Sequence, residues 1–378
     1  MACKALDGQV AVPADDALKT LLDRYVCVRL VQMHGVDLKR FSFDGSLTWA
    51  IFMMNADGTI YGRYGSRSGL RDLSDREISL TGFKASLRGG LEMHGRYGQD
   101  KDAVGKALAG KTSSRTPKWR TPEAMPTLKD NARFNVPFLD ESGVRAGCIH
   151  CHMVPANEIR SLRLTNQPIP DRELVPYPMP NQLGFRMDPK EMATVLNVGP
   201  RSVAGRAGLQ KGDRIDAMAG QPILSTADIQ WVLHNAGDPA VVEMRIVRGD
   251  EAKTLRLTLA KGWRMRLPDW RFINKGLLRQ ALGFNVDMVP RRRARRMGLG
   301  GKLALTVDKT SRETRMKTGL GNKDLIIAVD GKRGPMTVGA FTAYVLREKK
   351  KGDKLTVRIM ELVDRFPRPE HDVEVTIK

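Results

Sequence analysis

One short stretch of the chain, GCIHCHMVP at 147–155, gathers thiols and imidazoles at a spacing that can do chemistry. Cys148, Cys151 and His152 form a C-x-x-C-H pattern, and His150 lies between the two cysteines. Thiols at this spacing can form thioether bonds to haem, while the histidine that follows ligates the iron. The pattern therefore predicts covalently bound haem c, a cofactor site made by Cys148, Cys151 and His152.

Other chemistries remain open for the same residues. Cys148 and Cys151 could cycle between dithiol and disulfide, because a C-x-x-C motif commonly lowers the thiol pKa. The two thiols could bind zinc together with His150 and His152, although such crowding makes poor tetrahedral geometry. The two cysteines could also be structural thiols. A sixth ligand for a haem iron would come from elsewhere, with these candidates beside the 18 methionines: His34, His94 and His234.

Composition indicates a globular protein with a strongly positive field. The chain has 378 residues, 41% hydrophobic and 28% charged, and a formal net charge of +21. Such a field attracts polyanions. Nothing resembles a module that reads nucleic acid, so we expect no specific nucleic-acid partner. One basic run is predicted to be a solvated loop that could contact an anionic surface: Arg291, Arg292, Arg293, Arg295 and Arg296.

The second half of the chain repeats itself. Leu183-Gly184-Phe185 returns as Leu282-Gly283-Phe284, AGLQKGDRIDAMAGQPI returns as TGLGNKDLIIAVDGKRG, and GDPAVVEMRIV returns as GDKLTVRIMEL. Matches in the same order along two segments indicate a duplicated fold. In the first copy a helix is expected after Ser225, and strand-like β-branched runs lie on both sides of it. Because the second copy repeats this pattern, we expect both copies to be β-rich modules.

The first copy resembles a PDZ domain in QLGF at 182–185 and in GPRSVAGRAGLQKGDRIDAMAGQPI at 199–223. The resemblance implies a peptide-binding groove. Leu183, Gly184 and Phe185 would hold a peptide carboxylate with backbone N–H groups, and the strand that follows would pair with the peptide. The helix that begins at Thr226 would form the other wall. The second copy keeps ALGF but departs from the pattern elsewhere, so its peptide binding is less expected.

The first block, residues 1–110, has the pattern of a small α/β domain. ADDALKTLLDRY and SLTGFKASLRGGLEMHGRY predict amphipathic helices, and an Asp-Gly turn predicts a hairpin within LTWAIFMMNADGTIYGRYG. The β-branched run YVCVRLVQM predicts a core strand in which Cys27 is buried.

This block resembles a thioredoxin-like domain, from CKALDGQ at 3–9 through the hairpin. The whole chain resembles the thioredoxin-like/PDZ domain (seleno)proteins of planctomycete-type bacteria. In that family a C-x-x-C motif opens the first helix, and Cys3 falls at its second cysteine. The partner cysteine and the preceding strand would lie upstream of Met1. We therefore expect a truncated start, with a degenerate domain as the alternative, and Cys3 as a possible redox remnant. The expected location is periplasmic or cell-envelope if the true start carries a signal. No signal peptide is visible in the chain as given.

Together these patterns predict a multidomain α+β protein. The expected parts are a partial thioredoxin-like domain (1–110), an extended linker with the C-x-x-C-H stretch (111–180), a PDZ domain (181–262), a linker (263–280) and a second PDZ-like domain (281–378). No hydrolase motif is present. The expected function is a redox or electron-transfer adaptor that PDZ modules attach to partner proteins. The alternatives are a non-catalytic scaffold and a thiol–disulfide oxidoreductase that uses Cys148 and Cys151.

Overall fold

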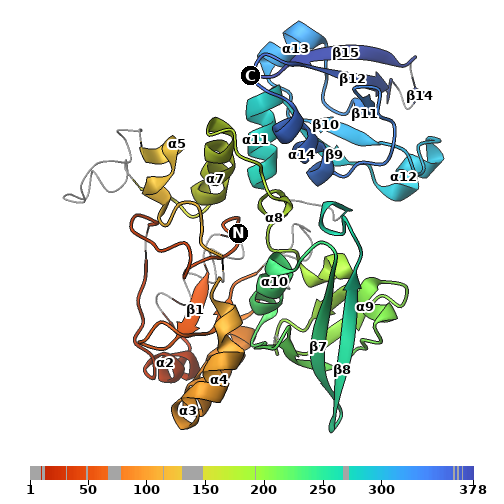
Figure 1. Ribbon diagram of the computed structural model, residues 1–378. Coiled ribbons are helices and arrows are strands. Elements are labelled where there is room, and N and C mark those ends of the chain that lie inside the picture. The colour runs from red at the N-terminus through yellow and green to blue at the C-terminus, as the bar shows by residue number, and fades with distance from the viewer. Residues whose placement is uncertain are drawn as a thin grey trace. The chain divides into compact units, whose positions relative to one another are not determined.

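The computed structural model describes residues 10, 13–30, 32–47, 50–66, 78–113, 115–129, 148–191, 193–266, 272–360, 362–363, 366–367 and 369–378 (Figure 1). It divides into two compact units. Unit 1 comprises Met1–Ser161 and Pro176–Lys261, and unit 2 comprises Leu162–Val175 and Gly262–Lys378. The first block and the first β-rich module thus belong to one unit, although the sequence suggested two separate domains. The domain boundaries drawn from the sequence stay a prediction.

The first block is built on a helix and a hairpin. Helix α2 (Asp16–Leu22) begins at the N-cap Asp15, whose carboxylate accepts a hydrogen bond from Leu18 N at 2.7 Å. Strands β1 (Ile51–Met54) and β2 (Ile60–Tyr64) pair antiparallel across the turn that contains Gly58, whose φ is 91°. The hairpin predicted at the Asp-Gly pair is therefore present, because glycine supplies the positive φ of the turn.

Two consecutive helices cover this hairpin. Helix α3 (Leu80–Gln99) is capped by Ser79, and α4 (Lys101–Leu108) is capped by Asp100. Phe83 and Leu87 of α3 are buried, as the helical spacing predicted. They share a core cluster with Leu18, Met53 and Tyr64, so the helices and the hairpin have one apolar centre.

The run after α2 differs from its prediction. Residues 26–30 form no strand, and Cys27 is an exposed free thiol rather than a buried strand residue. Val26 is 94% exposed, Val28 78% and Leu30 61%. The β-branched pattern predicts an extended backbone, but a core strand also needs neighbouring strands, and this run belongs to none of the sheets among the described residues. The thioredoxin-like resemblance of the first block is not confirmed.

The segment between the first block and the repeated modules contains more helix than the predicted extended linker. Its elements are η2 (Ala109–Lys111), η3 (Pro122–Ala124), α5 (Pro126–Lys129), α7 (Met153–Leu164), α8 (Asp171–Leu174) and η5 (Pro180–Leu183). Helix α7 starts immediately after the C-x-x-C-H stretch. Its Ile159 and Leu162 are buried, so the helix is held by packing despite the prolines around it.

The first β-rich module follows in unit 1. Strands β3 (Phe185–Met187) and β4 (Val195–Val198) form one antiparallel pair. A four-stranded sheet has the order β6-β5-β7-β8, and helix α9 contacts β8. The bounds of these elements are β5 (Arg214–Met218), β6 (Gln221–Pro222), β7 (Ala240–Arg248), β8 (Glu251–Leu259), α9 (Val203–Arg206) and α10 (Thr226–Asn235).

The second module repeats this order of elements in unit 2. A five-stranded antiparallel sheet has the order β15-β12-β11-β10-β9. Its elements are α11 (Phe272–Leu282), β9 (Asn285–Met288), α12 (Arg291–Arg296), β10 (Leu305–Asp308), α13 (Arg312–Thr318), β11 (Leu325–Val329), α14 (Val338–Glu348), β12 (Lys354–Met360) and β15 (His371–Thr376). A short pair, β13 (Leu362–Val363) with β14 (Phe366–Pro367), and the turn η6 (Arg264–Arg266) complete the unit. The elements β3, β4, α9, β5, α10 and β7 correspond in order to β9, β10, α13, β11, α14 and β12. This order agrees with the duplication expected from the sequence, and the second PDZ-like domain stays a prediction.

None of the described helices is long and apolar enough to cross a bilayer.

Candidate functional site

The candidate site of the first module lies around β3, which has a neighbour on one edge. Within the described part of the chain, β4 is the strand that pairs with β3, through Phe185 with Val198 and Arg186 with Asn197. The other edge carries main-chain groups that no described strand uses. An edge of this kind can accept an added strand from another chain.

Gly184 makes the tight turn that leads into β3. Its φ is 92°, and a Cβ built on it would lie 2.0 Å from Cβ of Ser202. The Gly184 carbonyl accepts a hydrogen bond from Gly199 N at 2.8 Å, which ties the turn to the start of the next loop. Glycine is therefore required here both by the backbone conformation and by the close approach of Ser202.

The predicted carboxylate loop is wound into the short helix η5 (Pro180–Leu183). The Gly184 N–H donates to the carbonyl of Asn181 at 3.1 Å, and the side chains of Leu183 and Phe185 are buried. An incoming carboxylate would therefore compete with an existing hydrogen bond of Gly184. The assignment of these residues to carboxylate binding stays a prediction.

Helix α10, the expected second wall, has no solvent-facing side. Its N-cap is Ser225, whose hydroxyl oxygen accepts from Ala227 N and whose O–H donates to the Arg63 carbonyl. Every residue from Thr226 to His234 is buried. A helix buried all round must be covered on more than one face. Thr226 thus lies at the start of the helix as predicted, but inside the unit.

A buried charge cluster joins α10 to the first block. Asp228 Oδ1 lies 2.8 Å from Lys111 Nζ and accepts a hydrogen bond from Arg63 N at 3.2 Å, while Oδ2 accepts from Leu224 N at 2.9 Å. The Arg63 guanidinium lies 4.0 Å from the centre of the Trp231 ring and donates to the Lys111 carbonyl. These contacts connect the hairpin, η2 and α10.

Burial dominates the electrostatics of the cluster. It lowers the pKa of Arg63 to about 10 and lowers the pKa of Lys111, while the charge of Asp228 acts in the opposite direction on both. One carboxylate therefore compensates two buried cations. Within the described residues, Arg63 Nε and Nη1 have no hydrogen-bond partner. Such a cluster is costly to disturb, because removing one partner leaves an uncompensated charge in a low dielectric.

Tyr177 packs on the far end of α10. Gln230 Nε2 donates to the Tyr177 carbonyl at 2.9 Å, and Tyr177 N lies 3.4 Å from His234 Nδ1. The Tyr177 and His234 rings stack with centroids 4.1 Å apart and planes 7° from parallel. The segment before the predicted carboxylate loop is thus held against the helix by both its main chain and its side chain.

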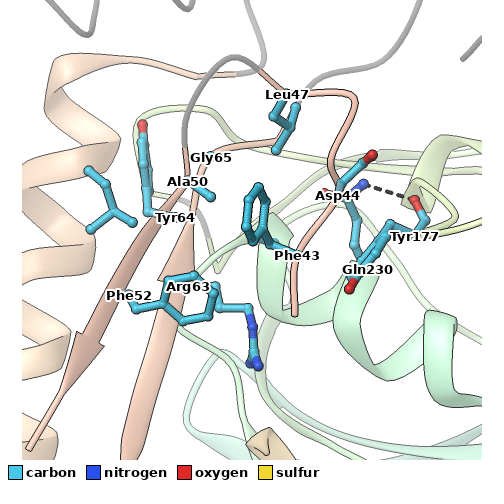
Figure 2. Close-up of a pocket in the computed structure, with 12 residues that line it drawn as sticks. Phe43, Asp44, Leu47, Ala50, Phe52, Arg63, Tyr64, Gly65, Tyr177 and Gln230 are labelled. Atoms are coloured by element: carbon cyan, nitrogen blue, oxygen red, sulfur yellow. Dashed lines mark hydrogen bonds between the residues drawn. The ribbon is translucent and has the colours of Figure 1, made fainter. Parts of the chain in front are cut away.

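A small pocket lies where Tyr177 and α10 meet the first block (Figure 2). Phe43, Leu47, Phe52 and Tyr64 make its lining mostly apolar, and the Arg63 guanidinium points away from Phe43 and Leu47. The free space is about 10 Å³, which is near the minimum for one water molecule. The pocket is therefore too small to hold a peptide side chain or a cofactor.

The second module repeats the glycine turn but adds a helix beside the groove elements. Gly283 has φ 79°, and a Cβ built on it would lie 1.9 Å from Thr314 Oγ1. Helix α11 runs directly into this turn and contacts both α14 and β9. Its Leu278 and Leu282 belong to one core cluster with Phe341 of α14. Helix α11 therefore packs against β9 and α14, the two elements that would form the groove of this module.

The C-x-x-C-H stretch forms a turn that leads into α7. Its main chain is fixed by a hydrogen bond from Met33 N to the Ile149 carbonyl at 2.9 Å. Cys148 and Cys151 are half-buried and form no disulfide among the described residues, and the rings of His150 and His152 stack with centroids 5.7 Å apart. On its inner side the stretch meets an apolar cluster that includes three methionines, Met33, Met125 and Met153.

The titration of this stretch differs from that of an activated redox pair. Burial raises the pKa of the Cys151 thiol. A nucleophilic cysteine of a C-x-x-C motif has, by contrast, a lowered pKa. Burial, and then the neighbouring His150, lowers the pKa of His152, which favours the neutral imidazole that can ligate a metal. Among the described residues, no three His, Cys, Asp or Glu side chains gather into a metal-binding group. Cys3 lies outside the described residues.

The basic run of the second module is a short helix, α12, rather than the predicted loop. Its arginines are exposed, while Ala294 is buried together with Val289 and Leu299 against Leu325 and Ile327 of β11. The described chain provides no carboxylate partner for Arg291, Arg292, Arg293, Arg295 or Arg296. Contact with an anionic surface stays a prediction.

Sequence patterns missed the contacts that lock α10 in place. Lys111 and Arg63 are single basic residues in unremarkable contexts, and Asp228 occupies an ordinary first-turn position of a helix. The one available signal was Trp231, a large aromatic residue in a helix expected to line an open groove; its Nε1 donates to the Gly110 carbonyl at 2.8 Å.

Comparison with protein families matches residues 194–248 to the PDZ domain. The match begins at the start of β4 and ends with β7, so it covers both helices of the first module. The chain therefore contains a PDZ domain, as its sequence pattern predicted.

Comparison with curated proteins finds a relative described as a probable periplasmic serine endoprotease DegP-like protein, from Marinomonas sp. (strain MWYL1). The two are 24% identical over 177 residues, which is 47% of this chain and 36% of the relative. The chain thus matches about a third of that relative's length. The aligned length exceeds that of the PDZ match, so similarity extends beyond residues 194–248.

Proposed function

We propose that this chain is an adaptor protein whose first PDZ module binds an extended segment of a partner protein along the free edge of β3. One observation carries the proposal: β3 (Phe185–Met187), which directly precedes the residues that match the PDZ domain, is paired on one edge within the described chain. Main-chain hydrogen bonds to that edge would supply affinity, and neighbouring side chains would supply specificity.

The partner's C-terminal carboxylate would be received at the turn before β3. Leu183, Gly184 and Phe185 are placed there, and the positive φ of Gly184 lets a ligand main chain come close. Binding would replace the Gly184 N–H bond to Asn181 with a charge-assisted bond to the carboxylate. Thr226 is buried at the start of α10, so the edge of β3 and the turn before it carry this binding mode.

The first module is the better candidate of the two. In the second module α11 packs on both β9 and α14, and its Leu278 and Leu282 are part of the core. A ligand there would have to displace a helix and expose apolar surface, which costs about 25 cal/mol per Å². We therefore assign peptide binding to the first module and a supporting role to the second.

Peptide binding is tested with the full chain and a library of fluorescent C-terminal peptides, read by anisotropy. The expected result is saturable binding by a subset of peptides, with weaker binding when the same peptide ends in an amide. Equal affinity for the acid and amide forms would contradict recognition of the peptide carboxylate. Addition of the peptide as a β-strand would then be the remaining binding mode. Absence of binding by every member would contradict peptide binding by this module.

A second proposal concerns the C-x-x-C-H stretch: Cys148 and Cys151 would hold haem c, and His152 would ligate its iron. The donor set fits this group. Neither cysteine forms a disulfide within the described residues, and the lowered pKa of His152 favours the neutral imidazole that can ligate iron. The adjacent apolar cluster contains Met33, Met125 and Met153, which are compatible with an apolar haem edge. A bound haem would supply one-electron transfer, which would make the protein a redox adaptor.

The haem proposal is tested by exporting the chain to a compartment that attaches haem and then denaturing it. A Soret band that stays with the denatured chain, and that Cys148→Ser and Cys151→Ser each reduce, is the expected result. His150→Ala is the matched control, because His150 lies outside the C-x-x-C-H triad, and it should keep the band. Complete loss of the chromophore on denaturation of the unchanged chain would exclude covalent haem.

Two related assignments have less support. A thiol–disulfide oxidoreductase that uses Cys148 and Cys151 is disfavoured by the raised pKa of Cys151. The periplasm is the compartment proposed for this chain, since its relative is described as periplasmic. In that compartment the chain would act beside proteases or other envelope proteins as a PDZ-containing partner.

A further inference from the structure

Helix α12 of the second module exposes a broad face made of arginines. Because an α-helix turns 100° per residue, these arginines lie within an arc of about 200°, and Ala294 lies outside that arc. The direction opposite Ala294 falls between Arg292 and Arg296. Ala294 is buried, whereas every arginine of the helix is exposed: Arg291, Arg292, Arg293, Arg295 and Arg296. The helix therefore turns its apolar side chain inward and its charges outward.

The inner side of α12 is anchored to the sheet of unit 2. Ala294 belongs to an apolar cluster with Leu299 and with Leu325 of β11. The main chain is fixed as well, since Ala294 N donates to the Pro290 carbonyl at 3.0 Å and Leu299 N donates to the Ala294 carbonyl at 2.9 Å. The arginines are thus presented to solvent from a held main chain.

The charge of this face is not neutralised by the module itself. Segment 288–302 adds Lys302 to the arginines and contains no acidic residue. Within the described part of unit 2, none of the α12 arginines forms an ion pair, although other basic side chains there do: Arg358 with Asp372 at 2.7 Å, Lys354 with Glu374 at 2.8 Å and Lys317 with Glu313 at 3.0 Å. Like charges three and four positions apart repel one another on a helix. The cluster therefore opposes the stability of the helix and fits an anionic partner outside the chain.

The shape and surroundings of the face favour an extended anionic surface. Arginines that spread outward from a helix diverge, so they do not converge on one small anion. Segment 288–302 also lacks an aromatic side chain on which a nucleic-acid base could stack. Apolar side chains flank the charges instead: Met288 at the end of β9 is 40% exposed, and Met297 after the helix is half-buried. Clustered basic residues with an apolar fringe are typical of segments that lie at the headgroup level of a membrane.

We propose that α12 binds the anionic phospholipid headgroups of a membrane surface, with Arg292 and Arg296 at the centre of the contact. The lipid phosphates supply the counter-charges that the module lacks, and Met288 lies against the headgroup layer. Because the attraction is between solvent-exposed charges, it decreases as ionic strength rises. The surface belongs to unit 2 and the edge of β3 belongs to unit 1, so lipid binding and peptide binding can fail independently.

The proposal is tested by co-sedimentation of the full chain with lipid vesicles. The anionic vesicles are an equimolar mixture of phosphatidylglycerol and phosphatidylcholine, and pure phosphatidylcholine is the neutral reference. The unchanged chain should bind the anionic vesicles and be released from them by added salt. Arg292→Ala combined with Arg296→Ala should weaken binding about 25-fold, at about fivefold for each basic residue near an anionic surface. Equal binding to both kinds of vesicle, or no binding at low salt, would overturn the proposal.

Two further double variants separate the α12 face from net charge and from folding. Arg312→Ala with Arg315→Ala removes the same charge from α13, another exposed helix of unit 2, and should weaken binding far less. An equal loss in this control would overturn the assignment to α12. Arg292→Lys with Arg296→Lys keeps the charge and should keep vesicle binding. All these side chains are exposed, so the free energy of unfolding in urea should stay close to that of the unchanged chain.

Nucleic acid and acidic protein are the competing partners for this face. Binding of duplex DNA, single-stranded DNA and polyglutamate is measured with the same variants at the same ionic strength. Binding to any of these that needs Arg292 and Arg296 and exceeds vesicle binding at equal concentration of negative charge would contradict the lipid assignment. Inorganic phosphate should release the chain from vesicles no better than chloride of equal ionic strength. Specific release by phosphate would show a site for a small anion and would likewise overturn the proposal.

Discussion

Lys111 Nζ lies 2.8 Å from Asp228 Oδ1 in the interior of unit 1, and both side chains are almost fully buried. The pair joins residues that are far apart in the chain, one in η2 and one in the wall helix of the PDZ module. Because Arg63 lies in the same cluster, a single carboxylate compensates two cations. The PDZ helix is therefore fixed to the first block by charge as well as by apolar packing.

Replacing this carboxylate should destabilise unit 1 strongly. Asp228→Asn leaves Lys111 and Arg63 without a counter-charge, and breaking a buried pair in this way costs about 3–5 kcal/mol. The free energy of unfolding in urea measures the effect. Asp216→Asn is the control: its ion pair with Arg245 is more exposed and should contribute about 0–1 kcal/mol. Equal losses for both variants would contradict a buried charge anchor.

The glycine turns before β3 and β9 should tolerate no side chain. Gly184→Ala and Gly283→Ala combine a positive φ with Cβ contacts of 2.0 Å and 1.9 Å. Each should lose more than about 2 kcal/mol of unfolding free energy, from strain and overpacking together.

Gly249→Ala is the matched control for these turns. It has φ 59° but nothing within 4 Å of the added Cβ, so about 1–2 kcal/mol of backbone strain is the whole expected effect. A loss for Gly249→Ala as large as that for Gly184→Ala would show that conformation alone, and not the contact with Ser202, demands glycine.

Alkaline pH should weaken the fold through its tyrosines. Burial raises the pKa values of Tyr25, Tyr61 and Tyr344 to about 12 from an ordinary value of 10.0. The folded state therefore favours neutral tyrosine, and this contribution is complete below pH 10 and is lost as the pH rises toward 12. Tyrosinate absorbance, followed together with unfolding, measures the effect. Ionisation of all tyrosines near pH 10 in the still-folded chain would contradict it.

Cys151 should react slowly with alkylating reagents at neutral pH. Its pKa is raised by burial, and the thiolate is the reacting form. Mass spectrometry after timed alkylation should show that modification of Cys151 accelerates in urea, where burial is lost. Rapid modification of Cys151 in the native chain at pH 7 would contradict the raised pKa and revive the oxidoreductase hypothesis.

Local sequence patterns predicted the elements that depend on local chemistry. The hairpin at Gly58 follows from the positive φ that glycine allows, and helix α3 follows from the spacing of Phe83 and Leu87. The PDZ match likewise rests on a continuous pattern within 194–248. These features are encoded by neighbours in sequence, so they are visible without a structure.

Features that depend on distant partners were not predicted. The run Val26–Leu30 has the composition of a core strand, but composition does not specify which strand pairs with it. Helix α7 was not predicted, because prolines flank its helical pattern in the sequence. The charge cluster of Lys111, Arg63 and Asp228 requires the fold itself, because nothing in the sequence near any of the three points to the others.

The central claim, that a partner segment binds along the free edge of β3, is tested most directly by amide exchange with and without a bound C-terminal peptide. Binding should slow exchange at residues 185–188 and at Gly184, while residues 285–288 of β9 should keep their rates as an internal control. Protection that appears at β9, or at neither strand, on saturation with the peptide would contradict the assignment of the site to the first module.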